Sequence, residues 1–97
     1  MRVSVLSLAR DDIRDIHIYL SEFGETQPSK FKESFKKFCV NVSGMPQMYS
    51  KYEHNPLYQK AVLIYGYIAF YQVDESGGVV KVHRVLHGKR NVVSLLD

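Results

Sequence analysis

The sequence predicts an α+β fold with the element order β-α-α-β-β-β, in which a helical hairpin covers one face of an antiparallel sheet. Two observations support this prediction. Apolar residues recur at helical spacing in two adjacent segments of the first half of the chain, whereas aromatic and β-branched residues, which strands prefer, dominate the second half. With 97 residues the chain has the length of one small domain, and we expect residues 1–97 to form it.

The first half is predicted to form a short strand and two amphipathic helices. An apolar run over residues 3–8 indicates the strand. Helices are predicted over 11–23 and 27–43, because apolar residues recur there every three or four positions. The two stripes are Ile13, Ile16, Leu20 and Phe23, then Phe31, Phe35, Phe38 and Val42. Asp11 and Asp12 favour the amino end of the first helix through its dipole. The residues expected to be largely buried against the sheet are Ile16, Leu20, Phe35 and Phe38.

The second half is predicted to contain three strands joined by turns, over residues 58–64, 67–73 and 79–86. The preceding stretch 45–56 is polar and contains two prolines, which predicts a loop. The apolar tail 91–96 fits either a helical turn or an added strand. Alternation along the last strand assigns its residues to opposite faces. Val80, Val82, Arg84 and Leu86 would share one face, and Val79, Lys81, His83 and Val85 the other.

Composition limits the possible functions. The net charge of +3 suits an acidic protein partner or nucleic acid. A single cysteine, Cys39, excludes an intramolecular disulfide, and its place in an apolar helical run favours a buried, inert thiol. Neither a signal peptide nor a membrane-spanning run is visible, so we expect a cytoplasmic protein without membrane contact. No metal site and no cofactor motif is predicted.

Two stretches in the second half have a distinctive sequence. Residues 66–75 read GYIAFYQVDE, and residues 84–91 read RVLHGKRN. With the element order and the length, these stretches resemble the RelE/ParE toxin superfamily of type II toxin–antitoxin systems, whose members include plasmid-stabilisation toxins. The resemblance implies a toxin that inhibits growth until a cognate antitoxin binds it. RelE-like members cleave messenger RNA on the ribosome, whereas ParE-like members inhibit DNA gyrase, and the fold alone does not choose between them.

The RelE-like nuclease residues are mostly missing from this sequence. The resemblance places two catalytic lysines on the second strand, an arginine on the third, another arginine after the fourth and a tyrosine near the end. When this sequence is aligned on Gly66-Tyr67 and on Gly88-Lys89-Arg90, four of these residues are replaced by others and only Arg90 is kept. The replaced positions are Gln59, Ala61, Ile68 and Leu96. Lys60 lies between the two lysine positions and should point to the other face. The pattern favours the ParE-like branch, and therefore a protein that is not an enzyme.

The predicted target-binding residues are those of the carboxyl-terminal motif: Arg84, His87, Lys89 and Arg90. Their charges suit binding to a protein target, and in the first interpretation this target is DNA gyrase. The alternative is a ribosome-dependent endoribonuclease acting on messenger RNA, with Arg90 holding phosphate and His87 transferring protons. A third interpretation is an inactive relative that serves only as a binding module. For His83, packing within the strand is favoured over catalysis.

The predicted partner is an acidic antitoxin. A basic toxin with a small core should bind an acidic, amphipathic segment that crosses the helical hairpin and continues along a sheet edge. Sequence alone does not give the antitoxin's family or the stoichiometry of the complex.

Overall fold

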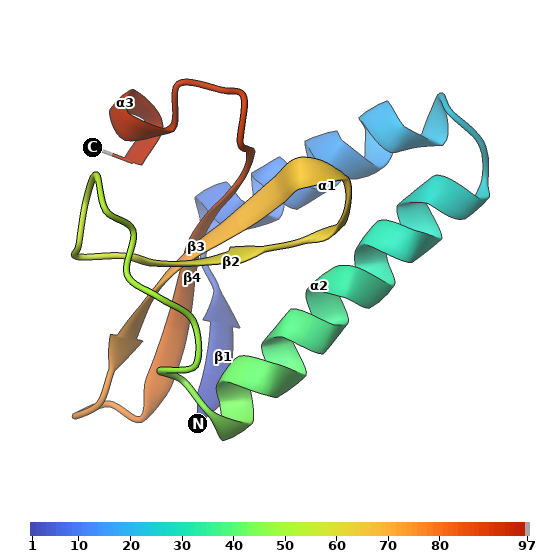
Figure 1. The fold of residues 1–97 in the computed structure, drawn as a ribbon. Helices are drawn as coiled ribbons and strands as arrows, with labels where there is room; N and C mark the ends of the chain where they lie inside the picture. Colours follow the sequence, from blue (N-terminus) through green and yellow to red (C-terminus); the bar gives the residue numbers. More distant parts are fainter. Residues whose placement is uncertain (97) are drawn as a thin grey trace.

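The computed structural model describes residues 1–96 and has the predicted α+β fold and element order (Figure 1). Its helices and strands are β1 (Arg2–Val5), α1 (Ser7–Ser21), α2 (Thr26–Gly44), β2 (Gln59–Val62), β3 (Tyr67–Asp74), β4 (Val79–His87) and α3 (Val92–Leu96). A 3-10 turn, Ile64–Gly66, joins β2 to β3. Within residues 1–96, no helix combines the length and apolarity needed to cross a lipid bilayer.

The sheet is mixed rather than wholly antiparallel. Its strand order is β1-β4-β3-β2, and β2, β3 and β4 form the predicted antiparallel meander. β1 instead pairs with β4 in parallel, from Arg2 beside Val79 to Val5 beside Val82. The helical hairpin explains this direction, because it returns the chain to the end where β1 begins. The amino group of Met1 donates a hydrogen bond to the carbonyl of Ser43, in the last turn of α2.

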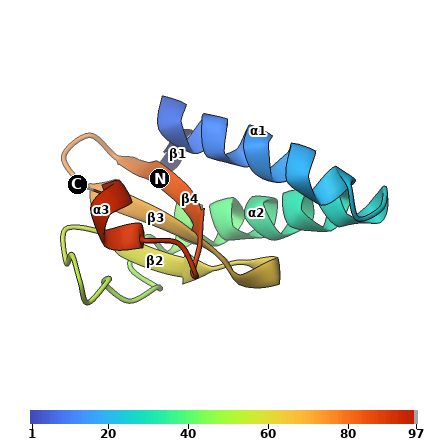
Figure 2. The same ribbon diagram turned by 90° about the horizontal axis from the view of Figure 1, so that it is seen from above.

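The two long helices lie on one face of the sheet, as predicted (Figure 2). Ile16, Leu20 and Phe38 are buried, with 7%, 6% and 2% of their surface exposed. The Phe38 ring packs against Tyr71 of β3 at a centroid distance of 5.5 Å. Phe35 is only partly buried, so the prediction that it is largely buried is wrong. Its ring covers that of Phe38 at the margin of the core, 5.8 Å away.

The first helix is displaced along the chain relative to its predicted range. It begins at Ser7 rather than at residue 11, because the Leu6 amide still donates to Val82 and the Leu6 carbonyl already accepts from Arg10. Asp12 therefore lies in the second turn of α1, away from its amino end. The helix ends at Ser21, which leaves the Phe23 side chain 61% exposed instead of on the buried stripe.

The opposite face of the sheet has its own small core. The carboxyl-terminal tail forms a helical turn, α3, and not an added strand. α3 places Val92 and Leu96 against Phe70 of β3 and Leu86 of β4, and Tyr52 from the loop before β2 completes the cluster. We call this the outer face, since the helical hairpin covers the other one.

A β-bulge in β4 changes the faces predicted for this strand. Phe70 of β3 pairs with Arg84, but the next residue, Tyr71, pairs with Val82, so His83 is an extra residue. The alternation therefore shifts at His83. Val80 and Val82 face the hairpin together with Val85, not with Leu86 as predicted.

Candidate functional site

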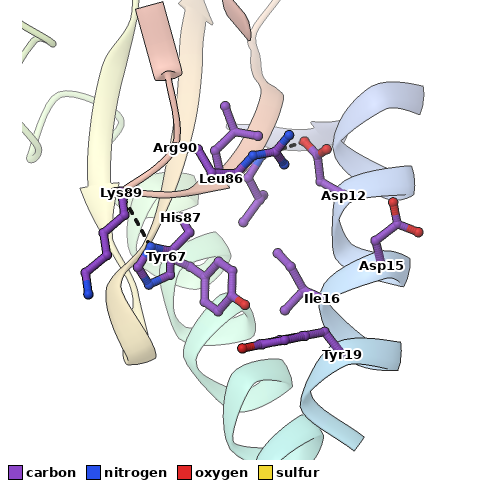
Figure 3. A pocket seen from close by; sticks show the side chains of 10 residues that line it. Asp12, Asp15, Ile16, Tyr19, Tyr67, Leu86, His87, Lys89 and Arg90 are labelled. Carbon is purple, nitrogen blue, oxygen red and sulfur yellow. Dashed lines mark hydrogen bonds between the residues drawn. The ribbon is translucent and has the colours of Figure 1, made fainter. Parts of the chain in front are cut away.

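A cavity of about 560 Å³ lies between α1 and the second half of β4 (Figure 3). It forms there because β1 ends at Val5 and pairs with β4 only as far as Val82, so α1 borders the rest of that strand. Side chains of α1 make one wall, and β4 with the turn after it makes the other. The lining residues are Asp12, Asp15, Ile16, Tyr19, Tyr67, Val85, Leu86, His87, Lys89 and Arg90.

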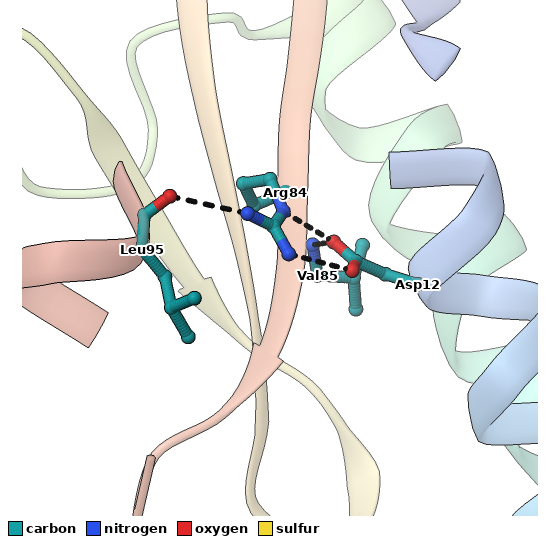
Figure 4. Close-up of polar contacts among 4 residues, drawn as sticks. All are labelled: Asp12, Arg84, Val85 and Leu95. Carbon is teal, nitrogen blue, oxygen red and sulfur yellow. Dashed lines mark hydrogen bonds and ion pairs between the residues drawn. The ribbon is translucent and has the colours of Figure 1, made fainter. Parts of the chain in front are cut away.

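Asp12 and Arg84 form a nearly buried ion pair at one end of this cavity (Figure 4). The Arg84 guanidinium donates to both Asp12 carboxylate oxygens, at 2.8 and 2.9 Å. Only 16% of the Arg84 side chain and 10% of the Asp12 side chain are exposed. The hydrogen bonds to Asp12 raise the pKa of Arg84 despite its burial, so the guanidinium stays charged.

The same pair links three elements of the fold. The third Arg84 nitrogen, Nη1, donates to the Leu95 carbonyl of α3 at 3.1 Å. Asp12 also accepts the backbone amide of Val85, at 3.0 Å, on the edge of β4 that β1 leaves unpaired. Arg84 thus joins α1, β4 and α3, and its charge is directed inward at Asp12. The sequence analysis selected Arg84 as a site residue but gave no indication of this partner.

His87 lies at the end of β4 in a tightly packed turn. Its ring stands edge-on to Tyr67 at 5.2 Å, and its Nδ1 accepts the Lys89 backbone amide at 3.1 Å. Gly66 approaches closely, since a Cβ there would lie 3.0 Å from His87 Nε2. The Gly88 amide donates to the Gly66 carbonyl at 3.0 Å. The two glycines of the sequence motif therefore hold His87 in place.

Lys89 and Arg90 are exposed at the turn that follows β4. The Arg90 amide donates to the His87 carbonyl at 3.0 Å, which closes the turn. In Figure 3 the Lys89 side chain extends away from α1. Arg90 borders the cavity beside α1 and also a second cavity on the outer face. Three predicted site residues thus gather at one rim, while Arg84 is held apart.

The second cavity, of about 310 Å³, gathers charged residues that the sequence analysis did not single out. Glu53 and His54, from the loop before β2, join Lys60 and Arg90 there. Glu53 Oε1 lies 3.9 Å from Lys60 Nζ and 3.7 Å from His54 Nε2. The only feature of the sequence that could have indicated this cluster is the adjacent Glu53 and His54, because the loop before β2 has no periodic pattern.

Strand alternation puts Lys60, and not its neighbours, on the outer face. Gln59 and Ala61 are buried toward the hairpin, 7% and 1% exposed, and Gln59 donates to the Tyr49 carbonyl. Lys60 faces Ile68 and Arg90 across the second cavity. The predicted opposite orientation of Lys60 is confirmed.

His83 is packed into the bulge of β4, in agreement with the structural role predicted for it. Its ring lies 5.2 Å from that of Tyr58, and its Nε2 is buried without a hydrogen-bond partner among residues 1–96. Burial, with a smaller contribution from Lys81, lowers the pKa of His83. The structure brings together no group of His, Cys, Asp and Glu within residues 1–96 that suits a metal ion.

Comparison with known proteins gives the family. The family model of the ParE toxin of type II toxin–antitoxin systems, parDE, matches residues 3–92. No curated protein matches the sequence. RelE in the intact Escherichia coli RelBE toxin–antitoxin complex is 26% identical, with a TM-score of 0.67 over 92% of this chain and 98% of that one.

Other structures share the fold. The isolated Escherichia coli RelE toxin is also 26% identical, with a TM-score of 0.67 over 98% of this chain and 93% of that one. A chain of the chromosomal ParDE system of Pseudomonas aeruginosa is 15% identical, with a TM-score of 0.63 over 90% and 95%. The family model covers nearly the whole sequence, and the chain therefore belongs to the ParE toxin family, within the RelE/ParE superfamily of type II toxin–antitoxin systems.

Proposed function

We propose that this type II toxin inhibits DNA gyrase by binding it through the carboxyl-terminal segment 87–96. The supporting observation is that exposed cationic and apolar side chains lie together on this segment. Lys89 and Arg90 are exposed, and the Val93 side chain beside them is 44% exposed. An apolar contact bordered by basic residues is typical of a protein-binding surface.

The outer face supports binding over RNA cleavage. Cleavage needs a proton-transferring base and acid together with cations on the phosphate. Ile68 occupies the position of one family arginine, and Leu96 takes the place of the tyrosine. Leu96 is 7% exposed and packs into the outer core, so its position is filled by a structural contact. An enzyme lacking these groups forfeits several kcal/mol of transition-state stabilisation.

One observation favours the alternative, a ribosome-dependent endoribonuclease. Glu53, His54, Lys60 and Arg90 border the same outer cavity. In this reading His54 would transfer a proton while Lys60 and Arg90 hold the phosphate. Arg90 fits either function because it borders both cavities. Of these two cavities, His87 borders the one beside α1 and not the outer one, which makes His54 the better placed histidine for this chemistry.

Purified toxin added separately to gyrase supercoiling reactions and to programmed ribosomes tests the proposal. We expect loss of supercoiling and intact messages. Lys89→Glu with Arg90→Glu should restore supercoiling, whereas Glu53→Gln with His54→Gln should leave inhibition unchanged. Codon-specific cleavage that the second pair abolishes, with supercoiling untouched, would establish the nuclease instead. Circular dichroism of each variant controls for folding.

The partner and the compartment follow from the same proposal. The relatives in the RelBE and ParDE complexes indicate an antitoxin partner. An acidic antitoxin would complement the net charge of +3. Gyrase and ribosomes are both cytoplasmic, so we place the toxin there.

A further inference from the structure

Helix α2 carries an excess of positive charge. It contains four lysines and a single acidic residue, Glu33, so its net charge equals the +3 of the whole chain. The other parts of the chain therefore carry as many acidic as basic side chains. All four lysines are exposed, and none lies in an ion pair among residues 1–96. They are Lys30, Lys32, Lys36 and Lys37.

Helical periodicity arranges these lysines in two rows. Lys30 and Lys37 are two turns apart on one flank of α2, and Lys32 and Lys36 are about one turn apart on the other. At about 1.5 Å of rise per residue, the four lysines span about 10 Å of the helix axis. The apolar stripe of α2 points the opposite way, into the core. We call the exposed side of α2 that carries the two rows the lysine face.

The composition of the lysine face disfavours a protein ligand. Between the rows lie Ser29, Glu33 and Val40, and Val40 is the one large apolar side chain within residues 26–44 that is exposed. Protein interfaces are enriched in aromatic residues, methionine and arginine, whereas lysine, glutamate and serine are depleted there. A membrane surface is also a poor ligand, because the apolar side that α2 would have to insert is buried in the core.

Duplex DNA fits the lysine face. It carries one negative charge for about every 1.7 Å of its axis, which places about six phosphates along the 10 Å that the lysines span. Each lysine is a point charge on a flexible stem, so each can reach a phosphate. A single strand would instead need exposed aromatic rings on which its bases stack. α2 offers none, because Phe31 and Phe38 are buried and Phe35 is partly buried.

The lysine face and the carboxyl-terminal segment lie on opposite sides of the sheet. α2 belongs to the hairpin that covers one face, whereas α3 packs on the outer face (Figure 2). Both surfaces are therefore available at the same time. Because gyrase holds duplex DNA while it supercoils it, a toxin bound to gyrase has this polyanion close by.

We propose that the lysine face of α2 binds the phosphate backbone of duplex DNA. The toxin then contacts gyrase through segment 87–96 and the DNA that gyrase holds through α2. The choice of DNA rests on the proposed function. The contact is electrostatic and independent of base sequence, and together with the contact to gyrase it gives tighter binding than either contact alone.

Titration of a fluorescein-labelled duplex of about 20 base pairs with the intact toxin tests the lysine face without gyrase. Fluorescence anisotropy at several salt concentrations gives the binding constant and its salt dependence. Four phosphate contacts predict that log K falls with log[salt] with a slope of about −3.6. Changing one row, by Lys30→Gln with Lys37→Gln or by Lys32→Gln with Lys36→Gln, should bring the slope to about −1.8. Glutamine has nearly the helix propensity of lysine, so these variants should fold.

A matched control removes the same charge outside α2. Arg14→Gln with Lys51→Gln changes two exposed cations and should leave the slope unchanged. Equal slopes for this control and for the α2 variants, or no binding by the unmodified toxin at about 50 mM salt, would overturn the proposal. Duplex RNA bound at least about tenfold more tightly than DNA would assign the face to RNA, and polyglutamate that displaces the DNA at equal charge concentration would assign it to an acidic protein. Either result contradicts the DNA site.

The variant with all four lysines changed to glutamine connects the lysine face to gyrase. Its half-inhibitory concentration in supercoiling reactions should rise at least about tenfold, whereas the Arg14→Gln, Lys51→Gln control should inhibit like the unmodified toxin. An unchanged half-inhibitory concentration would contradict the contact with gyrase-held DNA. A toxin that binds the duplex through its lysines but never inhibits gyrase would support the DNA site and refute the proposed function, so the two failures are distinguishable.

Discussion

At the scale of single residues, the Asp12–Arg84 pair is the least exposed ion pair among residues 1–96. Removing one partner from a nearly buried pair leaves an uncompensated charge. We expect Arg84→Met to lower the free energy of unfolding by about 2–4 kcal/mol, which is less than the about 3–5 kcal/mol of fully buried pairs because both side chains keep some exposure. Urea denaturation measures this change.

A double-mutant cycle separates the pair from the individual side chains. Asp12→Leu combined with Arg84→Met should recover much of the stability, because no unpaired charge remains. Additive losses in the double variant would mean that the two residues do not stabilise each other, contrary to the structure.

His83 predicts how stability depends on pH. Burial lowers its pKa in the folded state, so between the lowered value and the ordinary one of about 6.5 the unfolded chain binds more protons. Stability contributed by neutral His83 is therefore present above pH about 6.5 and lost as the pH falls below it. Thermal melts at pH 7.5 and 5.5 should show a smaller acid loss for His83→Gln than for the unmodified toxin. An equal loss in both would assign the effect to other groups.

Sequence reasoning found the exposed site residues but not the buried contacts between them. His87, Lys89 and Arg90 are contiguous in a motif, so their gathering at one turn was predictable. Asp12 and Arg84 are 72 residues apart in the chain, and no local pattern relates them. The ion pair depends on where β1 stops, which only the folded sheet determines.

At the scale of elements, the aromatic stripe of α2 sets the strength of the hairpin–sheet contact. Phe38 is 2% exposed and packs against Tyr49 and Tyr71, so Phe38→Ala should cost about 3–5 kcal/mol. Phe35→Ala should cost less, because its ring is only partly buried. Equal losses in denaturant titrations would contradict the packing described for α2.

α3 is a structural element as well as part of the proposed binding surface. Deleting residues 92–97 removes Val92 and Leu96 from Phe70 and Leu86, and we expect a lower melting temperature. The exposed Val93 offers a cleaner test, since Val93→Ser should weaken target binding and leave the melting temperature within about 2 °C. A truncated toxin that melts like the intact one would show that α3 does not support the outer core.

Helical spacing predicted both long helices, because three- and four-residue repeats fix which side chains share a face. It predicted the ends of the helices less well. The start of α1 depends on Leu6, whose amide still pairs with β4 while its carbonyl already accepts the first helical hydrogen bond. The pattern of apolar and polar residues in β4 does not indicate the bulge at His83. It inverted the predicted faces of the residues beyond it, which explains why Arg84 does not share a face with Val82.

At the scale of the whole molecule, length, composition and element order were sufficient for the fold class. The parallel pairing of β1 with β4 was missed, because strands far apart in the sequence show no register signal. The two faces of the sheet also differ in the features that they carry. The hairpin face carries the main core and the cavity beside α1, while the outer face carries α3 and the charged cluster around Lys60.

The central proposal is that toxicity comes from binding a replication enzyme and not from cutting messages. Induced expression in bacteria, with DNA and protein synthesis followed separately by labelled thymidine and methionine, tests it most directly. We predict that thymidine incorporation falls first and that an SOS response follows, while methionine incorporation initially continues. Immediate arrest of methionine incorporation, with cleaved messages and continuing DNA synthesis, would contradict the proposal.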